Sequence, residues 1–154
     1  MKSFELRIVS NTPLVGEKDP DNVARTFLEQ IGYLSRGSDP SLPYKLFVDF
    51  FLRYPEKAWL VDDMAAKLST SRPTVYRHLN KLKSFDILEE VSIYDETTHQ
   101  NKKAYRLRYG DLQKAWSFVE AHIKVAVENY TRTVQHLQQL LDEERKEQQH
   151  EQQQ

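Results

Sequence analysis

Positive charge is concentrated in one short stretch of the sequence. Between Ser71 and Ser84 there is no acidic residue, and the cations are Arg72, Arg77, Lys81 and Lys83. A guanidinium group can donate two parallel hydrogen bonds to a phosphate or to the edge of a guanine, and an ammonium group can pair with a phosphate. Because the formal net charge of the whole chain is only -1, the distribution of charge is informative and its total is not.

The spacing within this stretch predicts a helix with two different faces. Ser71 can cap the helix, and Pro73 falls in the first turn, where its missing amide hydrogen has no intrahelical partner to lose. Val75, Leu79 and Leu82 recur at steps of four and three and form an apolar stripe. The opposite face is polar and basic, with Arg72, Thr74, Tyr76, Arg77, Asn80 and Lys81.

The elements before this helix have to position it. Leu46, Phe47, Phe50, Phe51 and Tyr54 predict a buried amphipathic helix that starts at Tyr44 and stops at Pro55. Residues 58–61 predict a very short strand. Asp62 is placed to cap a helix with Met64, Ala65 and Leu68 facing inward, and residues 69–71 form a tight turn.

The elements after the basic helix resemble a β-hairpin. Residues 88–94 and 104–109 have strand-like composition, and the polar residues 95–103 between them predict a long, mobile tip. Lys102 and Lys103 lie near the end of this tip, whereas Asp95 and Glu96 at its start would repel phosphate.

This order of elements, together with residues 64–82, resembles the winged helix-turn-helix of the ArsR and MarR-like transcriptional regulators, over residues 44–109. The resemblance implies a mainly α fold with a small β-hairpin, of class α+β. It also implies sequence-specific binding of double-stranded DNA, with helix 71–84 in the major groove and wing 95–103 on the backbone or minor groove. Asp86 stands where such regulators commonly have glycine, and aspartate tolerates the left-handed conformation at some cost.

The contacts to DNA are assigned by position on the helix and wing. Residues near the helix start or one turn in are expected to read bases: Arg72, Thr74 and Arg77. The remaining polar residues are expected to contact the backbone: Ser69, Ser71, Tyr76, Asn80, Lys81, Lys83, Lys102 and Lys103. His78 is expected to be structural.

A long helix should follow Gly110 and Asp111 and run to about Arg145. Its apolar residues follow a heptad, which is typical of a dimerisation coiled coil or, alternatively, of a helix in the core of one domain. We favour the dimer, because the seam is longer than one small domain can cover. The predicted dimer contacts are Leu112, Trp116, Val119, Ile123, Val127, Tyr130, Val134, Leu137, Leu140 and Leu141. A two-fold homodimer would recognise an inverted repeat.

Four segments are therefore expected. Residues 1–43 form an extension with a strand at 4–9 and a helix capped by Asp19 or Asp21, with an apolar face of Val23, Phe27, Ile31 and Leu34. Residues 44–110 form the DNA-binding domain, 111–146 the dimerisation helix, and 147–154 a disordered polar tail. No sequence signal assigns a role to the extension.

Several classes of function find no support in the residues. The chain has no cysteine, no signal peptide pattern and no stretch of about 18 apolar residues, so we expect a cytoplasmic protein that does not enter membranes. Glu120, His122 and His136 do not have the spacing of a metal site on one helix. We expect no enzyme, metal or cofactor, and the sequence identifies no small-molecule effector. The alternative function is a winged-helix module that docks proteins in a transcription or chromosome-partitioning complex.

Overall fold

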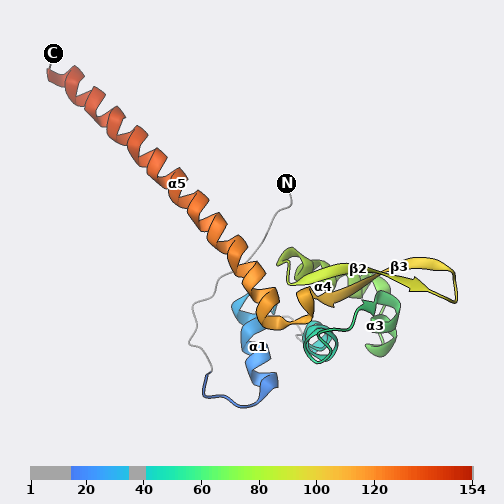
Figure 1. Ribbon diagram of the computed structural model, residues 1–154. Coiled ribbons are helices and arrows are strands. Elements are labelled where there is room, and N and C mark those ends of the chain that lie inside the picture. The colour runs from blue at the N-terminus through green and yellow to red at the C-terminus, as the bar shows by residue number, and fades with distance from the viewer. Residues whose placement is uncertain (1–14, 35–40, 154) are drawn as a thin grey trace. The chain divides into compact units, whose positions relative to one another are not determined.

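The computed structural model of the chain describes residues 15–34 and 41–153. Most of these residues are helical, and a three-stranded antiparallel sheet accompanies the long C-terminal helix (Figure 1). The α+β class expected from the sequence is confirmed. The chain divides into two compact units, Met1–Phe118 and Val119–Gln154, and the sheet belongs to the first of them.

The first described helix, α1 (Pro20–Gln30), begins at Asp19, whose Oδ1 accepts a hydrogen bond from the Asp21 amide at 3.0 Å. The capping prediction is confirmed for Asp19. The predicted apolar face is partly wrong, since Val23 is 38% exposed and Leu28 is the buried residue of the helix. The strand expected at residues 4–9 lies outside the described residues.

A short α-helix, α2 (Ser41–Lys45), continues directly into the π-helix η1 (Leu46–Leu52). The helix predicted from Tyr44 is present, but it starts earlier and takes the wider π form, with a hydrogen bond from the Arg53 amide to the Val48 carbonyl at 3.1 Å. Five of the seven η1 residues are buried, which makes this helix the centre of the core: Leu46, Phe47, Val48, Phe50 and Phe51.

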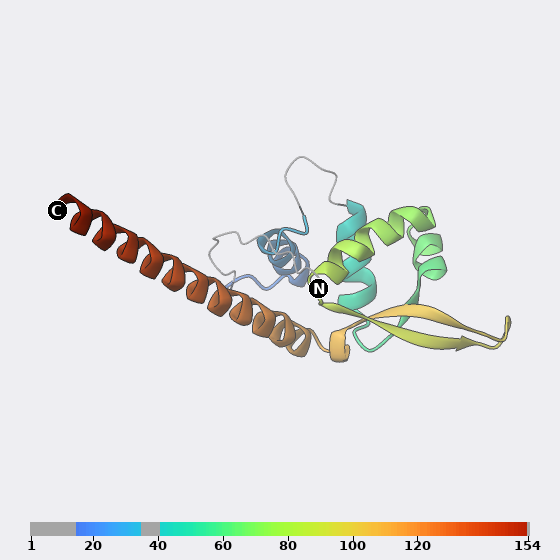
Figure 2. The same ribbon diagram turned by 90° about the horizontal axis from the view of Figure 1, so that it is seen from above.

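The sheet has the order β1-β3-β2, with β1 (Trp59–Leu60) and β2 (Leu88–Asp95) on either side of β3 (Gln100–Leu107). The β2–β3 ladder runs without interruption to the pair Asp95 and Gln100, so the tip contains only residues 96–99. The long tip predicted from polar composition is therefore wrong, because the backbone can pair whatever side chains it carries. The tip of the hairpin extends beyond the helices of the first unit in both views (Figures 1 and 2).

Helices α3 (Val61–Lys67) and α4 (Arg72–Ser84) follow one another in the chain. The turn between them is tight, with Ser69 at φ 52° and a hydrogen bond from the Thr70 amide to the Ala65 carbonyl at 3.0 Å. The predicted stripe on α4 is confirmed, since its three apolar residues are at most 1% exposed: Val75, Leu79 and Leu82.

The predicted cap of α3 is wrong. The N-cap residue is Leu60, which offers no side-chain hydrogen bond, and Asp62 lies one residue inside the helix. Its negative charge still favours the helix N-terminus electrostatically, but its oxygens accept hydrogen bonds from Arg72 of α4. Asp62 therefore pairs with a side chain of the next helix and does not cap its own helix.

Asp86 does adopt the left-handed conformation that the resemblance requires, with φ 59°. The Arg108 guanidinium donates to the Asp86 carbonyl oxygen at 2.6 Å and to the Leu88 carbonyl oxygen at 3.4 Å. These hydrogen bonds fix the start of β2 to η2 (Arg108–Gly110) at the end of β3, so the hairpin is held firmly at its base.

The C-terminal helix α5 (Leu112–Gln153) starts after Asp111, whose carboxylate accepts a hydrogen bond from the Lys114 amide at 2.9 Å. The predicted start is confirmed, but the helix does not end at Arg145. It continues to Gln153, within the segment expected to be a disordered tail, because Glu, Gln, Lys and Arg are good helix formers and neither glycine nor proline interrupts them.

Candidate nucleic-acid interface

The N-terminus of α4 is closed by its own hydroxyl groups. Ser71 Oγ accepts a hydrogen bond from the Thr74 amide at 3.3 Å and lies 2.9 Å from Thr74 Oγ1. The predicted cap is confirmed. Thr74, expected to read a base, is half-buried and has its hydroxyl engaged with Ser71, so its methyl group is the part best suited to contact a thymine. Ser69 is exposed in the turn.

Arg72 is tied to α3. Its Nη2 donates to Asp62 Oδ2 at 2.9 Å, and its Nε pairs with Oδ1 of the same carboxylate, in a bidentate arrangement. Both side chains are at least half exposed, so the ion pair is solvated and weak. Arg72 reaches a nucleic acid only by sharing or leaving Asp62.

Arg77 lies one turn further along α4 and is exposed. Among the residues that the structure describes, no carboxylate comes within ion-pair distance of it. Beside it on the surface, Tyr76 is 41% exposed and Asn80 is exposed, and exposed Lys81 lies one turn further along the helix. Of the two arginines predicted to read bases, Arg77 is therefore the one whose guanidinium is not paired with a carboxylate of the described residues.

The two lysines near the end of α4 are both engaged. Lys81 donates to the Tyr33 carbonyl oxygen at 3.4 Å, which connects α4 to the segment after α1. Lys83 pairs with Glu90 of β2 and lies 5.5 Å from the centre of the Tyr105 ring. Their assignment to phosphate stays a prediction, and for Lys83 the carboxylate is a direct competitor.

The surroundings of His78 disfavour its charged form. Burial lowers the pKa of His78, and repulsion by Arg77 and Lys81 lowers that pKa further. The imidazole is therefore held in its neutral form near pH 7, where it adds no charge to the basic face.

The β2–β3 hairpin, which the sequence predicts to be a wing, carries two lysines with different surroundings. Lys102 Nζ lies 2.9 Å from Asp95 Oδ2, across the hairpin. The hydrogen bond from Lys102 and that from the Thr97 amide lower the pKa of Asp95 to about 2. Lys103 is exposed and has no ion-pair partner among the described residues. Tyr94, which is exposed, shares a hydrogen bond with His99 near the tip.

The wing and the start of α4 belong to one electrostatic site. The hydrogen bond to Asp95 raises the pKa of Lys102; Asp62 raises it further and Arg72 lowers it. Asp62 and Arg72 therefore act on the charge of Lys102, although 40 residues separate Asp62 from Lys102 in the sequence. The two acids pair with the two bases, Asp62 with Arg72 and Asp95 with Lys102, so the charges of this group cancel.

Two further cations escaped the sequence interpretation. Lys57 and Lys67 lie over the ring of Trp59, with Nζ 3.8 Å and 4.8 Å from its centre. They are ten residues apart and follow no period that would have brought them together. Their aliphatic stems can cover the buried indole while the charges remain hydrated.

The predicted dimer contacts on α5 fall into two groups. Near the start of the helix, the Trp116 ring packs edge-on against Phe27 of α1 at 5.7 Å, and Val119 is 1% exposed. Trp116 is half-buried and Val119 is buried, so these two residues offer less surface to a partner than the later ones, and their place in a dimer seam stays a prediction. Leu112 is exposed and Ile123 is half-buried. The later members of the seam are all exposed: Val127, Tyr130, Val134, Leu137, Leu140 and Leu141.

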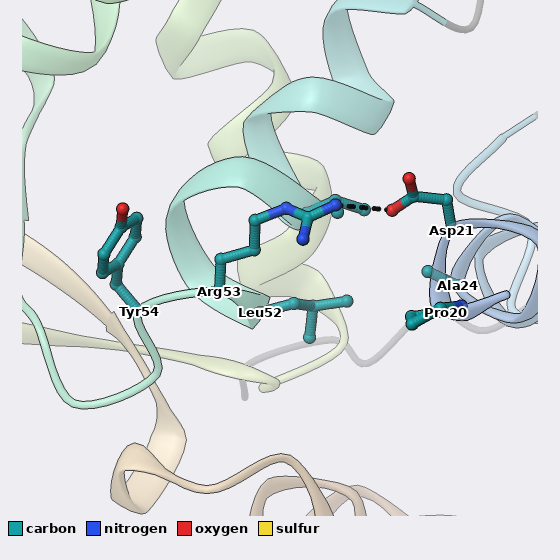
Figure 3. Close-up of a pocket in the computed structure, with 7 residues that line it drawn as sticks. Pro20, Asp21, Ala24, Leu52, Arg53 and Tyr54 are labelled. Atoms are coloured by element: carbon teal, nitrogen blue, oxygen red, sulfur yellow. Dashed lines mark hydrogen bonds and ion pairs between the residues drawn. The ribbon is translucent and has the colours of Figure 1, made fainter.

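A shallow pocket lies between α1 and η1 (Figure 3). Its wall contains Leu52 and Ala24 together with Arg53, whose Nη2 lies 2.7 Å from Asp21 Oδ1 and whose Nε lies 3.7 Å from Asp49. The one cation of the wall is thus shared between two carboxylates. The pocket offers no net positive charge to an anionic ligand.

Within residues 15–34 and 41–153, no helix has the length and apolar character needed to span a membrane. In the same ranges, no three side chains of His, Cys, Asp or Glu converge as a metal site would need.

No known protein family and no curated protein matches the sequence. A solved structure from Methanosarcina mazei Go1, described as a possible transcriptional regulator, is similar at 16% identity over 63% of this chain and 79% of that chain, with a TM-score of 0.38. A likeness of this size assigns neither a fold nor a function, so a proposal has to rest on the residues of the chain itself.

Proposed function

We propose that the chain is a sequence-specific regulator of transcription that binds double-stranded DNA as a homodimer, through a winged helix-turn-helix similar to that of the ArsR and MarR-like proteins. In this proposal α4 enters the major groove and the β2–β3 hairpin lies along the backbone or minor groove. The observation that carries it is the exposed, acid-free face of α4 around Arg77, on a helix whose other face is buried.

Arg77 is the central residue of the proposed reading surface. It is one turn from the helix start, with Thr74 before it and Asn80 after it on the polar face. A guanidinium group can donate to both O6 and N7 of guanine, and such a contact discriminates between base pairs. Arg72 joins this surface when a phosphate or a base displaces Asp62.

The wing supplies contacts that do not depend on sequence. Lys103 is exposed and has no ion-pair partner in the described part of the chain, and Lys102 is available once it leaves Asp95. Because both lie on a hairpin that is fixed at its base by Arg108, a phosphate contact there orients the whole domain on the duplex.

Salt-dependent binding tests the DNA proposal. In fluorescence anisotropy with a random-sequence labelled duplex, the affinity should fall steeply as salt increases, because each phosphate contact releases counterions. The double variant Arg77→Ala, Lys103→Ala should bind less tightly and with a shallower salt dependence. Arg132→Ala, Lys146→Ala removes the same charge from exposed positions on α5 and serves as the matched control.

If the anisotropy does not change even at low salt, the DNA proposal fails and the protein-docking alternative takes its place. If the two double variants lose affinity equally, the binding depends on total charge and the assignment to α4 and the wing fails.

The homodimer is supported by the exposed apolar side chains of α5, which water would otherwise surround. Val134→Glu places a charge in this seam and should convert the dimer into a monomer in analytical ultracentrifugation. Gln135→Glu adds the same charge at the next residue, outside the seam, and should leave the dimer intact. A wild-type monomer at micromolar concentration would contradict the proposal.

A further inference from the structure

We propose that α5 pairs with α5 of a second copy in the antiparallel direction, about a centre at Arg132. This inference rests on the proposed homodimer and specifies its geometry. It concerns the part of α5 in the unit Val119–Gln154, where the exposed apolar seam lies.

The seam is symmetric about Arg132. Tyr130 and Val134 each lie two residues from Arg132. Val127 and Leu137 each lie five residues away, and Ile123 and Leu141 each lie nine away. An antiparallel pair centred there places each of these six residues beside an apolar residue of the partner, whereas Leu140, whose mirror position is Lys124, falls outside this register.

The steps along this seam also fit a coiled coil. From Ile123 to Leu141 they alternate between four and three, which is the heptad rule for helices that pack side by side. In the antiparallel pair Tyr130 meets Val134 of the partner helix, which is a smaller residue. In a parallel pair two tyrosines would meet and their hydroxyl groups would compete for the same space.

Charge favours the same direction. The end of α5 is strongly acidic, with five acids against two bases: Asp142, Glu143, Glu144, Glu147 and Glu151 against Arg145 and Lys146. Residues 112–128 balance, with Lys114 and Lys124 against Glu120 and Glu128. A parallel pair brings the two acidic ends together, whereas an antiparallel pair lays each acidic end against the balanced segment. Like charges held side by side are destabilising.

The helix dipoles add to this preference. The C-terminal end of a helix carries partial negative charge, which the acids of α5 reinforce. Antiparallel pairing puts that end beside the earlier turns of the partner helix instead of beside an identical end. The dipole contributes little for each pair of charges, but it favours antiparallel pairing, as the side-chain charges do.

The direction has a consequence for DNA recognition. Phe118 ends the unit that contains α4 and lies 14 residues from Arg132. Antiparallel pairing separates the two Phe118 positions by roughly 42 Å along the helix axis at the standard rise per residue. Parallel pairing places them side by side, so the direction of pairing determines the half-site spacing that the dimer can accept.

Distances between spin labels test the proposal in the full chain. Because the sequence has no cysteine, Gln139→Cys and Gln149→Cys each give one labelled site per chain, at exposed positions outside the seam. In the antiparallel pair the two labels should be separated along the axis by roughly 21 Å for the first variant and roughly 51 Å for the second. The expected result is therefore a difference of about 30 Å in pulsed electron paramagnetic resonance.

Equal separations for the two variants, in a protein that sediments as a dimer, would overturn the antiparallel direction and leave the homodimer standing. A monomer at the same concentration would overturn both. Adding Val134→Glu to each labelled variant should abolish the distance, which shows that the signal comes from pairing through the seam.

Discussion

Helix α4 and the later part of α5 carry the same kind of apolar pattern and differ in what covers it. Val75, Leu79 and Leu82 are buried by the rest of their unit, whereas Val134 and Leu137 are 64% and 54% exposed. Both patterns predict an amphipathic helix from steps of three and four. The comparison teaches that periodicity identifies the face that needs a partner and does not identify the partner.

The largest expected effect is on the free energy of unfolding, and it should differ between these two apolar faces. Leu79→Ala should lower the free energy of unfolding by about 2 to 5 kcal/mol, since it leaves a cavity in a packed core. Leu137→Ala, the same change on α5, should leave that free energy within about 0.5 kcal/mol at protein concentrations where the chain is monomeric. Urea denaturation measures both. An equal loss for Leu137→Ala would mean that the chain covers its own seam.

A smaller effect, on DNA binding, should distinguish Arg77 of α4 from Lys103 of the hairpin. Arg77→Ala should reduce the preference for the cognate duplex over a random duplex by about 1 to 3 kcal/mol, because a base contact is lost. Lys103→Ala should weaken binding to both duplexes alike and reduce the salt slope by about 1. Competition anisotropy gives both ratios. If Arg77→Ala weakens both duplexes equally, Arg77 is a phosphate contact.

Removing the acidic partner of a paired cation should strengthen DNA binding, whereas removing a cation itself should weaken it. Asp62→Asn removes the ion-pair partner of Arg72, and we expect DNA affinity to rise by up to about 1 kcal/mol, the range of an exposed ion pair. Asp63→Asn removes the same charge from the neighbouring exposed position and is the matched control. The same gain in both variants would show that net charge, not the release of Arg72, causes it.

The smallest expected effect is the titration of the wing. With a pKa of about 2, Asp95 stays ionised until the pH falls well below the usual aspartate range. Its pKa is lower in the folded chain than in the unfolded one, so the stabilising contribution is complete above about pH 4 and is lost as the pH falls through about 2. Carboxyl NMR should find this midpoint, and Lys102→Met should raise it. An unchanged midpoint would exclude Lys102 as the main cause.

Local rules predicted much of the domain. Ser71 at the start of α4, Asp19 at the start of α1 and the left-handed Asp86 all act through groups a few residues away, so the sequence contained the required information. The errors came from long-range pairing. The length of the wing tip depends on the register of β2 with β3, which polar composition does not specify.

The candidate site was harder to predict than the helices that carry it. The basic face of α4 was visible as a run of cations, but its ion pairs join residues that are distant in the sequence, such as Asp62 with Arg72 and Asp95 with Lys102. Lys57 and Lys67 meet over Trp59 only because η1, β1 and α3 pack together. Coulomb interactions depend on distance in space, and the sequence order does not give that distance.

The sequence by itself determined where the helices begin, which of their faces are apolar and where the positive charge gathers, because capping, helical periodicity and composition act over a few residues. Only the tertiary structure decided which cations stay free and which apolar stripe stays uncovered. Arg77 and Lys103 are exposed and form no ion pair among the described residues, while Arg72 and Lys102 are paired. Trp116 is packed against Phe27 while Leu137 remains exposed, since burial depends on what the rest of the chain can reach.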